Sequence, residues 1–240
     1  MAGMSAIARL ARVETKLLVR EPGSIFTIVI PLFILVVFGM SLTPGDTVLL
    51  PMTLAIGVGL VALYMVPTTL ATYRERGILR RLSATPLRPG ALLAVQLLLQ
   101  LVLAVAGSAL LLVVAGAFLG AALPSGAAGA GRVALVFVLG TAAMFAIGLL
   151  IAALAPNGRS ANGIGVLLYF PMAYLAGMMQ PEASMPAVLA RLGGFTPLGA
   201  FRRALQDVWA GVAPQPLQLG IMAGYAVIVS LAAARFFRWE

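Results

Sequence analysis

Charges are so sparse along this chain that the stretches without one predict its helices. A helix that crosses a lipid bilayer needs about 20 consecutive apolar residues. Several stretches of at least that length contain no Asp, Glu, Lys or Arg, and glycine and proline residues divide the longest of them, 89–131. The pattern predicts an all-α polytopic membrane protein with six spans, at 24–42, 48–71, 91–119, 133–155, 162–180 and 217–234.

The cations between these predicted spans lie mainly on one side of the membrane. Four of the sixteen would lie on the outer side: Arg132, Arg191, Arg202 and Arg203. The other twelve fall on the side that holds both termini: Arg9, Arg12, Lys16, Arg20, Arg74, Arg76, Arg80, Arg81, Arg88, Arg159, Arg235 and Arg238. Because cytoplasmic loops carry an excess of Lys and Arg, we expect both termini to lie in the cytoplasm of a bacterial cell.

Composition narrows the chemistry that such a protein can perform. Only 10% of its 240 residues are charged, whereas a soluble domain carries about 25%. The chain has no cysteine and no histidine, and its seven acids are scattered. We therefore predict no catalytic, metal-binding or cofactor-binding residues. The net charge of +9 is expected to face anionic lipid rather than nucleic acid.

The first basic segment, 5–20, has the pattern of an amphipathic helix that lies in the cytoplasmic interface. Its cations Arg9, Arg12, Lys16 and Arg20 share one stripe, and Ile7, Leu10, Leu17 and Leu18 lie opposite. Glu14 lies among the apolar residues and breaks this pattern. Two interpretations stay open: the helix is a simple anchor, or Glu14 pairs with an arginine of another segment or of a partner subunit.

A second amphipathic pattern covers 72–83, within the loop 72–90 that follows the second span. Ile78, Leu79 and Leu82 lie on one arc with Glu75. The opposite arc holds four arginines: Arg74, Arg76, Arg80 and Arg81. Pro86 and Pro89 end the pattern before the third span. A loop that serves only to orient the chain needs no such order.

The letters of this loop, "YRERGILRRLSATPLRP", resemble the first cytoplasmic loop of the type-2 permeases of ATP-binding-cassette (ABC) exporters. In that family the loop forms a coupling helix that docks on a nucleotide-binding subunit. The resemblance assigns this role to eight residues: Tyr73, Arg74, Glu75, Arg76, Gly77, Arg80, Arg81 and Leu82.

Two further segments resemble the same family. "ARVETKLLVREPGSIFTIVIPLFILVVFG" is similar to its interfacial helix and first span, and this match includes Glu14 and Lys16. "LAGMMQPEASMPAVLARLGGFTPLGAFRRAL" is similar to its element between spans five and six. The resemblance implies a single transmembrane domain, 1–240, whose outer loop 181–216 contains short re-entrant helices.

The resemblance also implies the function. The chain would be the permease subunit of an exporter that moves an amphiphilic drug, a lipid or a lipid-linked glycan outward by alternating access. ATP and magnesium would bind a separate subunit, since the only lysine, Lys16, lacks the glycines of a phosphate-binding loop. A second permease copy would complete the pore, and we expect a homodimer rather than a heterodimer.

Polar and aromatic residues within the spans suggest a substrate path. Gln96 and Gln100 are one turn apart on the third span, and Tyr169, Tyr174 and Met178 lie on the fifth. Polar side chains in a span face the bundle interior, and methionine surfaces adapt to varied apolar ligands. The same residues could instead bond and pack neighbouring helices.

Two other functions compete with export. An intramembrane enzyme needs a buried acid, base or nucleophile pair, which a chain without His, Cys or deep carboxylates does not supply. A membrane assembly factor that resembles the cytochrome-maturation ABC subunits has a similar length and span count. The coupling-loop signature predicts an ATPase partner in that case too.

Overall fold

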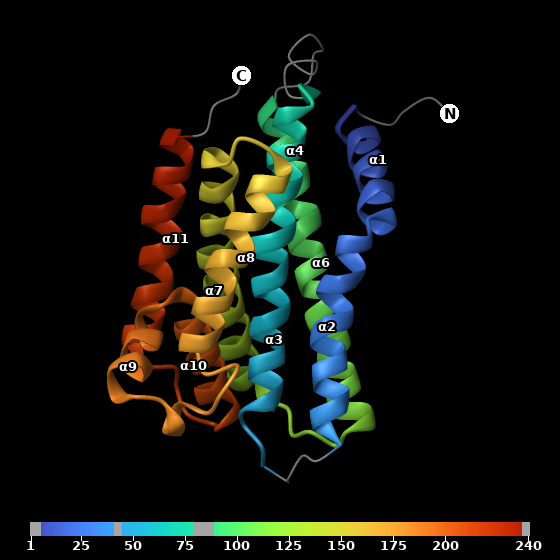
Figure 1. Ribbon diagram of the computed structural model, residues 1–240. Coiled ribbons are helices and arrows are strands. Elements are labelled where there is room, and N and C mark those ends of the chain that lie inside the picture. The colour runs from blue at the N-terminus through green and yellow to red at the C-terminus, as the bar shows by residue number, and fades with distance from the viewer. Residues whose placement is uncertain (1–5, 41–44, 79–88, 237–240) are drawn as a thin grey trace.

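The computed structural model describes residues 6–40, 45–78 and 89–236, and every regular element in these ranges is a helix. The long helices run side by side as a bundle (Figure 1). They are α2 (Pro22–Gly39), α3 (Leu49–Leu60), α4 (Val66–Glu75), α6 (Pro89–Phe118), α7 (Gly126–Leu154), α8 (Gly158–Leu175) and α11 (Pro216–Phe236). The all-helical fold expected from the sequence is confirmed for the described ranges.

The two ends of the bundle differ in what they carry. Helices α4 and α11 finish at one end, beside α1 (Ala6–Arg20), and we call it the proximal end (Figure 1). Helix α2 finishes and α3 begins at the opposite, distal end. The shorter helices α9 (Ala187–Phe195) and α10 (Pro197–Trp209) also lie there (Figure 1).

Five helical segments are long and apolar enough to cross a membrane: Pro22–Gly39, Leu49–Glu75, Leu92–Phe118, Gly126–Leu154 and Pro216–Phe236. The protein is therefore a multi-pass membrane protein. Helix α8 takes the place of the predicted fifth span and packs along α4. Its 18 residues include Arg159 and Asn162 near the start and are not among these five segments, so its crossing stays a prediction.

The second span is the central element of the bundle. Helices α3 and α4 are joined by one π-helical segment, η1 (Val61–Met65), and the whole segment Leu49–Glu75 is 78% buried in its most apolar window. Its two neighbours approach closely at glycines. A Cβ at Gly148 of α7 would lie 2.1 Å from the Ala62 carbonyl oxygen, and one at Gly165 of α8 would lie 1.8 Å from that of Leu63. Only glycine fits these two positions.

Two boundaries differ from those expected. The helix predicted over 72–83 is interrupted, because α4 ends at Glu75 and Gly77 adopts φ +64°, the left-handed conformation that ends many helices. The loop expected before residue 133 is mostly helical, because α7 already begins at Gly126. Its first turns are alanine and glycine, and alanine is the strongest helix former.

The distal helices complete the core rather than cover it. Phe201 and Leu205 of α10 are fully buried, and α10 packs against α7, α3 and α11. The ring of Phe201 fills the space that a side chain on Gly140 of α7 would need, 2.1 Å from its Cβ position. Short helices in the predicted loop 181–216 are therefore present. Their depth in a membrane stays a prediction.

Candidate functional site

Three consecutive residues at the proximal end of α4, namely Tyr73, Arg74 and Glu75, contact four other helices, and we call them the α4 junction. Tyr73 Oη donates a hydrogen bond to Glu14 Oε2 of α1 at 2.6 Å. Gln96 Nε2 of α6 donates to the same carboxylate oxygen and to Tyr73 Oη, the latter at 3.0 Å. Glu14 and Gln96 are buried. This network joins α1, α4 and α6.

Arg74 turns to the opposite side and binds the C-terminus of α7. Its Nη1 donates to the carbonyl oxygens of Ala152 at 2.9 Å and Ala153 at 3.1 Å, and its Nη2 donates to that of Ala155. The last carbonyls of a helix have no partner within the helix. Arg74 supplies a partner for two of them and for the Ala155 carbonyl in the turn that follows, and all three alanines are buried.

Glu75 binds the helix that follows this turn. Its Oε2 accepts a hydrogen bond from the backbone N–H of Gly158, the first residue of α8, at 3.1 Å. The Asn157 side chain accepts from the N–H of Ser160 at 2.8 Å, so two side chains cap the same helix start. Thr72 Oγ1 lies 2.1 Å from the position that a Cβ would take on Gly158. The α7–α8 turn is therefore held against α4 from both sides.

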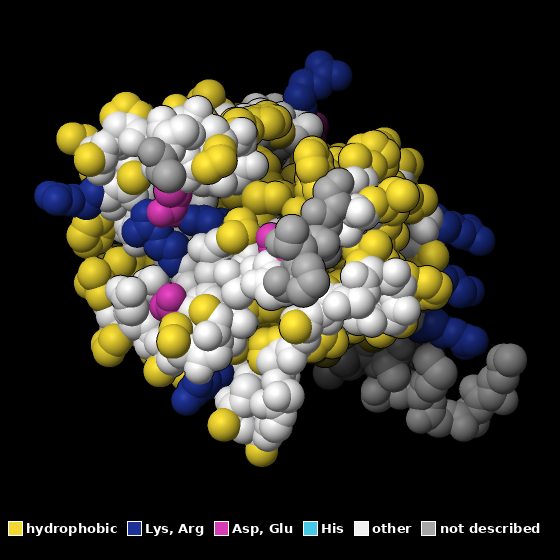
Figure 2. All heavy atoms as spheres, turned by 90° about the horizontal axis from the view of Figure 1, so that it is seen from below, with side chains coloured by type: hydrophobic (Ala, Val, Ile, Leu, Met, Phe, Trp, Pro, Cys, Tyr) yellow, Lys and Arg dark blue, Asp and Glu magenta, His cyan; other side chains and the backbone are white. Residues whose placement is uncertain are grey.

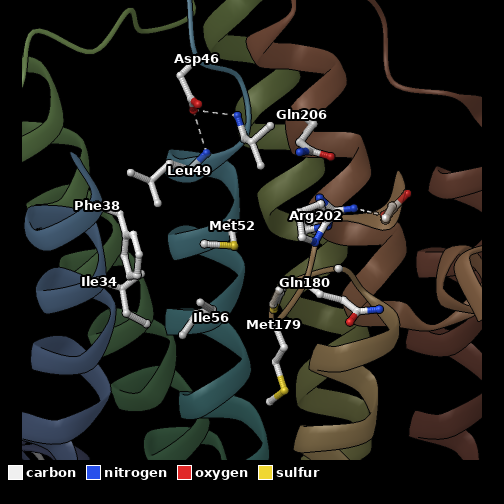
Figure 3. Close-up of a pocket in the computed structure, with 15 residues that line it drawn as sticks. Ile34, Phe38, Asp46, Leu49, Met52, Ile56, Met179, Gln180, Arg202 and Gln206 are labelled. Carbon is white, nitrogen blue, oxygen red and sulfur yellow. Dashed lines mark hydrogen bonds and ion pairs between the residues drawn. The ribbon is translucent and has the colours of Figure 1, made fainter. Parts of the chain in front are cut away.

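A groove of about 800 Å³ opens at the distal end, between α2, α3 and the residues that follow α8. This volume is typical of small-molecule sites. Its apolar wall consists of Ile34, Phe38, Met52, Ile56, Met178 and Met179, and its polar residues are Asp46, Gln180, Glu182, Arg202 and Gln206 (Figure 3). We call it the distal groove. Asp46 also caps α3 by accepting from the N–H groups of Val48 and Leu49 at 3.0 and 2.8 Å.

One carboxylate organises the charges beside the distal groove. Glu182 pairs with Arg202 and accepts from Arg203 Nη2 at 3.0 Å. Figure 2 shows basic and acidic side chains gathered in a hollow of this face. Burial lowers the pKa of the Arg202 guanidinium, and the Glu182 charge counteracts that effect. Arg203 also donates to the Ala190 carbonyl oxygen at 2.6 Å, which links α10 to α9.

Comparison with known families identifies the family to which this chain belongs. The family model described as ABC-2 type transporter matches residues 5–208, from the start of α1 into α10. The chain belongs to the ABC-2 type transporter family. A comparison with curated protein sequences finds no match. The match confirms the resemblance noted in the sequence. Permeases of the ABC-2 family are transport subunits that act with ABC ATPase subunits.

The residues predicted to contact the ATPase subunit have different surroundings in this ABC-2 protein. Tyr73 and Arg74 face other helices, and Glu75 is exposed although it binds α8. Arg76 is exposed and Gly77 is half-buried beyond the end of α4. Arg80, Arg81 and Leu82 lie outside the described residues. Lys16 is exposed on α1, whereas Glu14 bonds to Tyr73 and Gln96 rather than to an arginine among the described residues.

The residues predicted for a substrate path do not come together. Gln96 belongs to the network around Glu14, and Gln100 is fully buried on α6. Tyr169 lines a separate apolar cavity of about 190 Å³, and the Tyr174 hydroxyl accepts from Gln180 Nε2 at 3.1 Å. Met178 alone among these five lines the distal groove.

Sequence reasoning missed most of the distal groove and the role of the α7–α8 turn. Ile34, Phe38 and Met52 look like ordinary span residues, because nothing in an apolar run says which face is open. Arg202 and Glu182 gave the stronger signal, since an arginine and a glutamate in an otherwise apolar outer segment need partners. The sequence does not show that they pair.

Proposed function

We propose that this chain is the permease subunit of an ATP-driven exporter in the bacterial cell membrane. The match to the ABC-2 family over residues 5–208 carries the proposal. The proximal end would face the cytoplasm with both termini, as the excess of Lys and Arg in the proximal loops favours. Six crossings, with α8 as the fifth, would then place the distal groove at the outer leaflet.

The coupling segment would be the chain from Tyr73 to Leu82. It begins in the last turn of the most buried span, so a push on it acts on the centre of the bundle. Gly77, at φ +64°, lies between the α4 junction and the rest of the coupling segment. Arg76 is exposed at this point and is the first residue that we expect to meet an ATPase subunit.

The distal groove supports an amphiphilic cargo, such as a drug, a lipid or a lipid-linked glycan. Phe38 and Met179 line it and are 62% and 54% exposed, so an apolar chain can reach the groove from the side. Gln180, Glu182 and Arg202 offer polar groups to a head group at one place. A second copy of the chain would complete the pore, and alternating access would then expose the cargo outward.

The test is a complex of this chain with an ABC ATPase subunit encoded beside its gene, purified together and placed in lipid nanodiscs. We expect Arg76→Ala to weaken the association by about tenfold, equal to about 1.4 kcal/mol, with a stronger salt dependence. We also expect ATP hydrolysis by the wild-type complex to rise with some members of a panel of amphiphiles.

Arg235→Ala is the matched control, because Arg235 is an exposed arginine at the same end of the bundle, on α11. It should leave the association unchanged. A chain that binds no ABC ATPase subunit would refute the proposed function. Equal effects of the two substitutions would refute the role of Arg76.

A further inference from the structure

Arg74 and Glu75 are neighbours in sequence, yet they bind the two sides of one turn. The guanidinium binds two carbonyls at the end of α7 and that of Ala155 in the turn, and the carboxylate binds the first N–H of α8. The turn between them is only three residues long, from Ala155 to Asn157. Movement of Arg74 and Glu75 therefore acts on α7 at its C-terminal end and on α8 at its N-terminal end.

The charges match the ends that they bind. A helix carries a partial negative charge at its C-terminus and a partial positive charge at its N-terminus. Arg74 lies at the C-terminus of α7, and Glu75 lies at the N-terminus of α8. Each interaction is thus a charge-assisted hydrogen bond, which is shorter and stronger than a neutral one.

Close packing next to the turn prevents α7 and α8 from sliding along the second span. Thr72 occupies the space that a side chain on Gly158 would need, and the second span touches α7 and α8 again at Gly148 and Gly165. Backbone lies against backbone at both of these glycines. Densely packed interiors transmit displacement rather than absorb it.

We propose that Arg74 and Glu75 are positioning residues that carry the movement of the coupling segment to α7 and α8, rather than residues that hold the ATPase subunit. The inference rests on the proposed function, because the movement would come from ATP hydrolysis in that subunit. Arg74 and Glu75 act by pulling the α7–α8 turn with the end of α4. The docking contacts begin at Arg76, beyond the end of α4.

The chain has no cysteine, so two cysteines can be introduced for spin labels without first replacing any native cysteine. Arg159→Cys labels the start of α8, and Leu98→Cys labels α6, where both positions are exposed. Labelled chains are diluted with unlabelled ones in the reconstituted complex, and the distance between labels is measured by double electron–electron resonance. We expect ATP with vanadate to shift this distance in the wild-type protein.

Glu75→Ala removes the acceptor for Gly158 and should lose most of that shift, while the ATPase subunit stays bound and hydrolyses ATP. Glu75→Gln keeps an acceptor oxygen without the charge and should retain most of the shift. Arg74→Ala should behave as Glu75→Ala does, which keeps the test valid if one variant folds poorly. Arg235→Ala should shift as the wild type does.

The outcomes separate the inference from the proposed function. An unchanged shift in Glu75→Ala and Arg74→Ala would overturn the inference. So would loss of the ATPase subunit from these variants, because the two residues would then be docking contacts. A wild-type complex that hydrolyses ATP without any shift would overturn it as well. If the wild-type chain binds no ATPase subunit at all, the proposed function itself fails.

Discussion

Glu14 is a buried carboxylate at the surface of a bundle with little charge. It is 6% exposed, and its Oε2 accepts hydrogen bonds from Tyr73 and Gln96. A buried carboxylate is tolerated only where donors satisfy it. Tyr73 is both a donor to Glu14 and an acceptor from Gln96, so the loss of any one member takes a buried hydrogen bond from each of the other two.

We expect Tyr73→Phe to lower the free energy of unfolding by about 1.5–3 kcal/mol, the usual contribution of a hydrogen bond to a charged group. Glu14→Ala should lower it by a similar amount, and the double variant should cost less than the sum because the two residues act as a pair. Thermal unfolding of the detergent-solubilised protein measures both. Arg12→Gln, an exposed change on the same helix, is the control, and equal melting temperatures for it and Tyr73→Phe would contradict the role of the network.

The sequence could show that Glu14 is out of place, but not what it binds. A carboxylate among apolar residues of a basic helix predicts a partner, and an arginine is the ordinary choice. The nearest arginine in sequence to Tyr73 is Arg74, which points instead to the end of α7. Which of two adjacent residues faces α1 depends on the rotation of α4, and residue pattern does not determine that rotation.

At the scale of elements, the second span is the axis on which the other helices are placed. Helices α2 and α6 pack on one side of it, and α7 and α8 pack on the other. The π-helical segment Val61–Met65 lies where Gly148 and Gly165 approach. Such segments are rare and are frequent at functional sites. The close approach here brings the second span into direct backbone contact with both α7 and α8.

Gly165→Ala tests this approach, because its Cβ would meet the Leu63 carbonyl oxygen at 1.8 Å. We expect it to lower the free energy of unfolding by about 1–3 kcal/mol, the usual cost of overpacking. Gly163→Ala on the same helix has no atom within 4 Å of its Cβ position. It should be neutral or stabilise α8 by up to about 1 kcal/mol. Equal effects of the two substitutions on thermal unfolding would show that α8 does not press on the second span.

Apolar runs predicted most of the long helices to within a few residues, because the cost of a charge in lipid marks where a span stops. Helices α2, α6 and α11 begin and end close to the predicted bounds. The predicted bounds agree less well with the structure where an apolar stretch lies outside the predicted spans, as at the start of α7. The alanine-rich start of α7 reads as a loop only because its glycines suggest one, and the π-helical segment has no residue signature at all.

For the whole molecule, the two ends of the bundle carry different chemistry. The proximal end has most of the exposed arginines of the described residues and the α4 junction, and the distal end has the groove and the Glu182 ion pairs. This division suits a transporter that receives energy at one end and releases cargo at the other. It requires α8 to cross the membrane, since α8 connects a proximal turn to a distal helix pair.

Single cysteines test that crossing in a background that contains none. Arg159→Cys lies at the start of α8, and Val212→Cys lies beyond α10, where Val212 is 52% exposed. We expect an impermeant maleimide to label Val212→Cys in intact spheroplasts, and Arg159→Cys only in inside-out vesicles. Labelling of both from one side would show that α8 does not cross. Lysed membranes, in which both positions should react, are the control.

The contacts of the α4 junction can form only in a fixed order during synthesis of the chain. The Tyr73 bond to Glu14 involves residues that have both been synthesised by the time α4 is complete. The partner of Glu75 is Gly158, which at about 5–20 residues per second is synthesised roughly 4–17 s later. Until then the second span carries a guanidinium and a carboxylate without their helix ends. A nascent chain that stalls before the α7–α8 turn thus leaves both charged side chains of the second span without the partners that they have in the complete protein.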